Sequence, residues 1–118
     1  QDSWGVRLQR LSLSHCRSLD QQAFSSLAQW IQDRVPSGLT ELDLSDTMVT
    51  VEVLKAVLRW SGRLEVNIEG CRRLTSMEIC RELKELPKSG RVKLKVGKDM
   101  NEKLIKEMGD EVKFWLRG

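Results

Sequence analysis

Residues 8–16 read LQRLSLSHC, and residues 39–47 repeat the arrangement as LTELDLSDT. A third copy, LEVNIEGC at residues 64–71, has a shortened beginning, and a fourth, VKLKVG at residues 92–97, keeps only the alternation of apolar and polar residues. Such alternation is typical of a β-strand with one buried face. The second apolar residue of each alternating pair falls at positions 13, 44, 68 and 96, so the copies follow one another in steps of 31, 24 and 28 residues. The repetition predicts four strands, near residues 9–13, 40–44, 64–68 and 92–96.

A helical pattern follows each strand, and residues that favour helix starts precede it. Asp20, Thr50 and Thr75 are candidate N-caps, and TSME at residues 75–78 is a capping box. DMNE at residues 99–102 resembles a second box. Apolar residues at helical spacing predict four helices, near residues 20–34, 50–60, 76–86 and 100–115. The residues expected to end the first three helices are Pro36, Gly38, Gly62, Pro87 and Gly90.

The first and third copies continue in the same way after their cysteine. Leu19 and Asp20 follow Cys16, and Leu74 and Thr75 follow Cys71, at the same spacing. This pattern resembles the cysteine-containing, RNI-like leucine-rich repeats of F-box/leucine-rich repeat proteins, over residues 8–96. Thr47 departs from it by replacing cysteine, and the fourth copy is degenerate. The resemblance implies an α/β fold: a right-handed solenoid with a parallel β-sheet on its concave face and helices on its convex face.

The whole chain, residues 1–118, is expected to form one leucine-rich repeat domain of about three and a half repeats, with a C-terminal cap at residues 97–118. Because the first residue is Gln1 and not methionine, we expect a fragment of a longer protein. The end of a stack of repeats exposes its core unless it is capped. Trp4 and Trp115 lie near the two ends of the chain and are candidate lids, and Phe114 supports a C-terminal cap.

The composition argues against several classes of protein. Apolar residues make up 40% and charged residues 31% of the chain, as in ordinary folded proteins, and no apolar run is long enough to predict a membrane span. Three cysteines and one histidine lack the spacing of a zinc site, so we expect no metal and no cofactor. Unpaired cysteines used as small apolar residues favour the cytoplasm or the nucleus.

His15 and Cys16 invite interpretation as an activated nucleophile, since imidazole beside a thiolate is a catalytic arrangement. Adjacent residues of an extended chain point in opposite directions, however, so the two are poorly placed to pair. We expect instead that Cys16 and Cys71 both point inward beneath a turn, and that the chain is not an enzyme. Further residues expected in the core are Leu42, Leu44 and Ile68. Cys80 fits either the core or a partly exposed position.

The residues between the strand leucines are expected to project from the concave face. The middle of that face is acidic, at Glu41, Asp43, Glu65 and Glu69, with lysines on one side and an arginine on the other. Crowded carboxylates destabilise a sheet, and such a cost without structural return suggests binding. The alternative is ordinary surface, with Glu65 and Lys93 as a weak cross-strand pair. The candidate binding residues are Arg10, Glu41, Asp43, Glu65, Asn67, Glu69, Lys93 and Lys95.

These expectations favour a non-catalytic protein–protein interaction module, monomeric on its own, whose partner carries a basic segment. Such a module fits the substrate-recognition part of a ubiquitin-ligase receptor, or a scaffold. The alternative is a nucleic-acid-associated protein. Its contacts would come from the basic second half: Lys55, Arg59, Arg63, Arg72, Arg73, Arg81, Lys84, Arg91, Lys93, Lys95 and Lys98. The overall charge of +3 is weak for that role.

Overall fold

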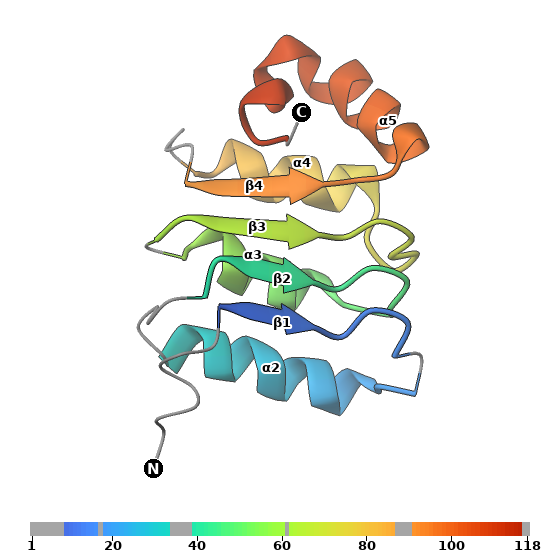
Figure 1. Ribbon diagram of the computed structural model, residues 1–118. Helices are drawn as coiled ribbons and strands as arrows, with labels where there is room; N and C mark the ends of the chain where they lie inside the picture. Colours follow the sequence, from blue (N-terminus) through green and yellow to red (C-terminus); the bar gives the residue numbers. More distant parts are fainter. Residues whose placement is uncertain (1–8, 17, 34–38, 61, 87–90, 117–118) are drawn as a thin grey trace.

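The computed structural model describes residues 9–16, 18–33, 39–60, 62–86 and 91–116. Within these residues, strands and helices alternate along the chain (Figure 1). The strands are β1 (Arg10–Ser12), β2 (Glu41–Asp43), β3 (Leu64–Asn67) and β4 (Val92–Lys95). The helices are α2 (Gln21–Asp33), α3 (Val51–Leu58), α4 (Ser76–Lys84) and α5 (Lys98–Met108), followed by the 3₁₀ helix η1 (Gly109–Phe114). All four predicted strands are confirmed, and a helix follows each.

The four strands form one parallel sheet in the order β1-β2-β3-β4, so neighbours in sequence are neighbours in space. Parallel neighbours need a crossover connection, which a helix supplies in each unit of strand, turn and helix. The register aligns Leu11 with Leu42, Leu42 with Val66, and Val66 with Leu94. One apolar row therefore crosses the whole sheet, and the predicted parallel pairing of the second and third strands is confirmed.

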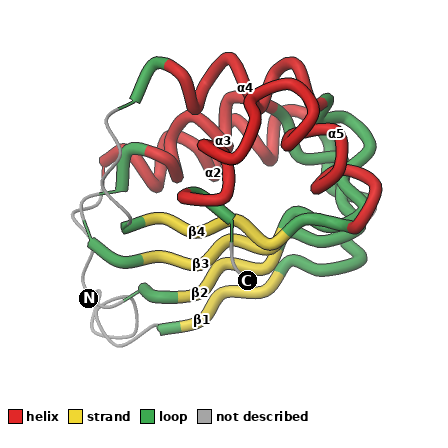
Figure 2. Tube along the Cα trace, turned by 90° about the horizontal axis from the view of Figure 1, so that it is seen from above, coloured by secondary structure: helices red, strands yellow, loops and turns green. Residues whose placement is uncertain are grey.

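The described part of the chain has two layers. Figure 2 shows the α-helices together on one side of the sheet and the strands on the other. None of the described α-helices lies against the far side of the sheet, which we call the open face. The molecule measures 46 × 31 × 22 Å along its principal axes. None of the helices described is both long enough and apolar enough to cross a lipid bilayer.

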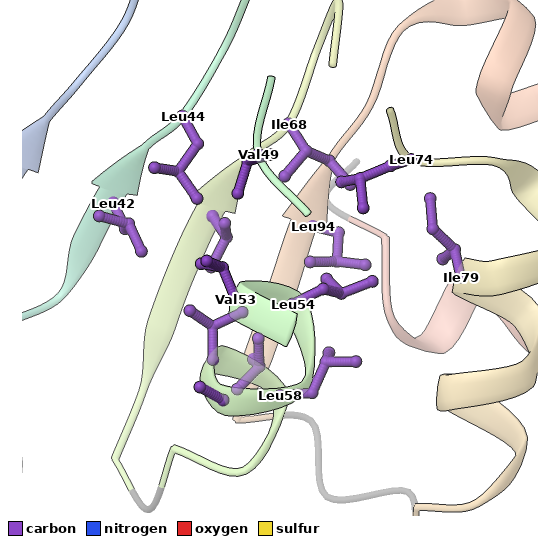
Figure 3. Close-up of a cluster of buried hydrophobic side chains, with 14 of the residues drawn as sticks. Leu42, Leu44, Val49, Val53, Leu54, Leu58, Ile68, Leu74, Ile79 and Leu94 are labelled. Atoms are coloured by element: carbon purple, nitrogen blue, oxygen red, sulfur yellow. The ribbon is translucent and has the colours of Figure 1, made fainter. Parts of the chain in front are cut away.

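The core lies between the sheet and the helices. Figure 3 shows Leu42, Leu44 and Ile68 from the strand side meeting Val53 and Leu54 from α3. All five are buried, as is Cys71, so the predicted core residues of the second and third units are confirmed. Burying an aliphatic side chain of this size contributes about 1.5–3 kcal/mol, so each of these residues stabilises the fold substantially.

The helix starts follow the predicted cap positions in the first three units and depart from the prediction in the fourth. Asp20 accepts a hydrogen bond from the Ala23 N–H at 2.8 Å, and Thr75 with Glu78 forms the predicted capping box. Thr50 is the N-cap of α3, but its buried hydroxyl makes no hydrogen bond. The box predicted at residues 99–102 is wrong, because α5 begins two residues earlier than predicted, with Gly97 as its N-cap.

The predicted helix at 100–115 is not continuous. It breaks at Gly109, whose φ angle of 75° no α-helix accommodates, and the chain continues as η1. This break turns the end of the chain back onto the sheet. The Leu94 N–H donates to the Trp115 carbonyl at 2.8 Å, and Leu116 forms a parallel bridge with Leu94. Trp115 is only 2% exposed, whereas Phe114 is 39% exposed.

The C-terminal segment thus covers the outer edge of β4. Some sequence predictions fall outside the described residues. They concern Leu8 at the start of the first copy, the candidate lid Trp4, and the expected helix ends at Pro36, Gly38, Pro87 and Gly90.

Candidate binding face

The predicted binding residues share the open face in rows set by the strand register. Arg10, Glu41, Glu65 and Lys93 are successive partners in the first row. The second row runs Ser12, Asp43, Asn67 and Lys95. These side chains line a groove of about 270 Å³, whose lining residues are Arg10, Leu11, Ser12, Glu41, Leu42, Asp43, Glu65, Val66, Asn67, Lys93 and Lys95. The structure therefore brings together all the candidate residues in one groove except Glu69, which follows β3.

The first row combines a like-charge contact with an ion pair. Glu41 lies opposite Glu65 in the register, where adjacent parallel strands run about 4.8 Å apart. Arg10 Nε lies 2.8 Å from Glu41 Oε2 and offsets part of that repulsion. Because both side chains of this pair are well exposed, it stabilises the fold by less than about 1 kcal/mol. The centre of the row therefore keeps a local excess of negative charge.

Lys93 ends the first row and is held by the C-terminal segment. Its ammonium group lies 5.0 Å from the centre of the Phe114 ring and donates a hydrogen bond to the Phe114 carbonyl. It is also the register partner of Glu65, as predicted. Cation–π contact at an exposed ring contributes about 0.5–1 kcal/mol, so Lys93 has a structural anchor in addition to any role toward the carboxylates.

The second row has a structural function that sequence reasoning missed. Asp43 Oδ1 accepts hydrogen bonds from the Ser45 N–H at 3.0 Å and from the Ser45 hydroxyl at 2.7 Å. Asn67 Oδ1 accepts from the Glu69 N–H at 2.9 Å in the same way. The expectation that the carboxylates bring no structural return is therefore wrong for Asp43, which forms a local Asx turn at the end of its strand. The sequence signal for an Asx turn is an Asp or Asn at the end of a strand, where its side chain can accept from the N–H two residues later.

Glu69 lies beyond the second row and has a basic neighbour. Lys95 Nζ lies 3.7 Å from Glu69 Oε1, and both side chains are exposed. The pair links the end of β4 to the turn after β3. All four predicted acidic residues have interactions within the chain: Asp43 with Ser45, Glu69 with Lys95, Glu41 with Arg10, and Glu65 as well. The adjoining Glu41 and Glu65 define the acidic centre of the groove.

The turns after the first three strands share one backbone feature. His15, Asp46 and Gly70 have φ angles of 64°, 56° and 73°, and each directly precedes the cysteine or threonine of its unit. His15 Nδ1 lies 3.2 Å from Asp46 Oδ2. The imidazole therefore contacts a carboxylate of the next unit, in a turn and not on an extended strand as the sequence argument assumed.

Cys16 is exposed, so the prediction that it points into the core is wrong. The reason is visible at the equivalent residue Cys71. The Cys71 Sγ donates to the Leu44 carbonyl of the preceding unit at 3.0 Å. Cys16 belongs to the first unit of the described chain, where no earlier strand is available to cover it.

The other two thiols, of Cys71 and Cys80, are shielded from solvent. Cys71 and Cys80 are both buried, which places Cys80 in the core. Burial raises the pKa of both thiols, because it disfavours the thiolate. Among the described residues, no group of three His, Cys, Asp or Glu side chains could hold a metal ion.

Four basic residues of the second half belong to two different surroundings. Lys55 Nζ and Arg59 NH1 lie 3.7 and 4.0 Å from carboxylate oxygens of Glu82, a buried residue of α4. Lys93 and Lys95 lie on the open face with the partners given above. In the described part of the chain, Phe114 is the most exposed aromatic side chain, and the Lys93 ammonium group already contacts its ring.

Comparison with known proteins adds no relative: no protein-family model, no curated protein and no solved structure matches this chain.

Proposed function

We propose that the chain is a run of cysteine-type leucine-rich repeats, a right-handed solenoid whose open face is the concave side and binds another protein without catalysis. Three features support this. The units of strand, turn and helix follow one another in spatial order. The equivalent turn residues of the first three units, His15, Asp46 and Gly70, have positive φ angles. The Cys71 thiol bonds to the unit before it.

The observation that carries the binding proposal is the acidic centre of the groove. Glu41 and Glu65 are register partners, so one lysine or arginine side chain of a partner can contact both carboxylates. Arg10 and Lys93 end the same row and repel further basic residues. The row therefore favours a partner segment that places a basic residue over Glu41 and Glu65 and none over Arg10 or Lys93. A partner segment shifted along the row would bring like charges together, which disfavours it.

The biological setting is part of the proposal. A module of this kind serves as the substrate-recognition part of a ubiquitin-ligase receptor or as a scaffold. Both uses place it in the cytoplasm or the nucleus. The unpaired cysteines Cys16, Cys71 and Cys80 suit such a reducing compartment.

The test is binding of a fluorescein-labelled extended peptide with a central Lys-Arg pair, measured by fluorescence anisotropy. The double variant Glu41→Gln/Glu65→Gln removes both central carboxylates and keeps the size of the side chains. Loss of two partly exposed charge contacts should weaken binding by about tenfold. The matched control is Glu102→Gln/Glu107→Gln, which makes the same charge change at exposed positions of α5. The control should retain binding within about twofold.

Equal loss in both variants would show that only overall charge matters, and the groove would then not be the binding site. The nucleic-acid alternative makes a different prediction in the same assay. A labelled single-stranded oligonucleotide would bind, and its association constant would fall steeply with salt concentration. Binding of the oligonucleotide in place of the peptide would replace the proposed function with that alternative.

A further inference from the structure

The two ends of the sheet are finished differently. At the β4 end, the C-terminal segment bonds to the strand edge and buries Trp115. At the other end, β1 pairs only with β2 within the part of the chain that the structure describes. The inward residues Leu11 and Leu13 of this first unit are partly exposed, whereas their equivalents Leu42 and Leu44 are each 1% exposed.

The same contrast holds between the first two helices. Leu27 and Trp30 lie seven and ten residues after the cap residue Asp20, and Val57 and Trp60 lie equally far after Thr50. Val57 and Trp60 are buried, but Leu27 and Trp30 are partly exposed. Two apolar residues of α2 are thus only partly covered, at positions that are buried one unit later.

The third helix shows what these positions contact. Glu82 lies seven residues after its N-cap Thr75, at the position of Leu27 and Val57. Its carboxylate lies close to Lys55 of α3, the helix of the preceding unit, and to Arg59, the C-cap of that helix. This position therefore faces backward along the stack of units, and Leu27 faces the place of a helix before α2.

Cys16 leads to the same conclusion from the strand side. Its equivalent Cys71 donates its thiol hydrogen to the carbonyl of Leu44 in the preceding unit. Cys16 is exposed, with no earlier unit in the described chain to supply such a carbonyl. A strand laid parallel on the edge of β1 that no described strand pairs with would supply it.

The outer surface of α2 also differs from those of the other helices. Its exposed residues before the last position are uncharged: Gln21, Gln22, Ser25, Ser26, Gln29 and Gln32. Exposed residues of α3, α4 and α5 include lysine, arginine and glutamate. A surface that lacks charged residues and leaves a leucine and a tryptophan partly exposed is typical of one that another element covers.

We infer that the β1–α2 end is an interface for one further strand–turn–helix unit of the same design, joined ahead of β1 as the present units are joined to one another. Its strand pairs in parallel with β1, one of its carbonyls accepts the Cys16 thiol, and its helix covers Leu27 and Trp30. This surface lies at the end of the sheet, so the inference goes beyond the proposed binding through the open face.

The test compares the 118-residue chain with an extended variant in which a copy of residues 39–62 directly precedes Leu8, in place of residues 1–7. In this copy, Lys55 and Arg59 are replaced by serine and glutamine, the residues of α2 at the same positions. The rate at which a thiol reagent modifies Cys16 is followed by peptide mapping. We expect the rate to fall at least tenfold in the extended variant, with the buried Cys71 and Cys80 slow in both proteins.

Leu27→Lys provides the matched control in each protein. In the 118-residue chain it should leave the Cys16 rate within about twofold, because Leu27 is already partly exposed. In the extended variant it should restore fast modification. Unchanged Cys16 reactivity on extension would overturn the inference. So would a dimer of the 118-residue chain in light scattering that Leu27→Lys dissociates, because the occupant would then be a second copy. Neither readout depends on peptide binding at the groove.

Discussion

At the scale of single residues, the turns after the strands need a left-handed backbone. Asp46 adopts it at φ 56° and Gly70 at φ 73°. Residues other than glycine rarely adopt this backbone conformation, and aspartate does so more readily than most. Gly70 meets a second constraint, because a Cβ atom there would lie 2.2 Å from Asp46 Oδ1. The same carboxylate, through Oδ2, contacts His15, so the three turns are packed against one another.

Gly70→Ala should therefore destabilise the protein by about 1–3 kcal/mol, from the left-handed strain and from displacement of Asp46. Gly97→Ala is the control, because Gly97 has φ −69° and no atom within 4 Å of an added Cβ. Its effect should stay below about 1 kcal/mol, since a stiffer unfolded chain offsets a weaker N-cap. Urea unfolding measures both. Equal effects would show that the turn packing contributes nothing.

At the scale of elements, hydroxyls at equivalent helix starts do different things. The Thr75 hydroxyl accepts a hydrogen bond from the Glu78 N–H at 3.2 Å, and the Glu78 carboxylate accepts one from the Thr75 N–H. The Thr50 hydroxyl occupies the same position before α3 but is buried and makes no hydrogen bond. A polar atom buried without a partner costs free energy, whereas a filled cap contributes it.

Replacing each threonine by valine keeps the shape and removes the hydroxyl. Thr75→Val should lower the free energy of unfolding by about 0.5–2 kcal/mol, because it breaks the capping box. Thr50→Val should be neutral or stabilising, because it removes an unsatisfied buried oxygen. Thermal unfolding followed by circular dichroism separates the two. A loss at Thr50 equal to that at Thr75 would mean that the Thr50 hydroxyl does have a partner in solution.

The elements also show how far the sequence could lead. Alternation and capping signals predicted every strand and the first three helices to within about two residues, because both signals are local. The predicted box at residues 99–102 is wrong because Gly97, which has no side chain to act as a cap, is the N-cap of α5. The predicted helix end near residue 115 is wrong because α5 ends before Gly109. The exposure of Cys16 and the bonds of Asp43 depend on neighbouring units and turns, which a period in the sequence does not specify.

At the scale of the whole molecule, the sheet is closed at β4 by residues that are not part of its repeating pattern. The Trp115 carbonyl accepts from Leu94, and the Trp115 ring and Val112 are buried. Without this segment the backbone groups at the edge of β4 would be free to pair with another chain. Its neighbour Phe114 faces outward, where it contacts Lys93 on the open face.

Trp115→Ala and Phe114→Ala separate closure of the sheet from the contact with Lys93. Trp115→Ala should cost about 3–5 kcal/mol, as expected for a large ring removed from a core. That is a large part of the stability of a small domain, so the β4 edge should open and aggregation should increase with protein concentration in light scattering. Phe114→Ala should cost about 1–2 kcal/mol, because the partly exposed ring loses its cation–π contact with Lys93 and its edge contact with the Trp115 ring. If Phe114→Ala aggregated as readily as Trp115→Ala, the C-terminal segment would close the sheet through the contact with Lys93 and not through the buried tryptophan.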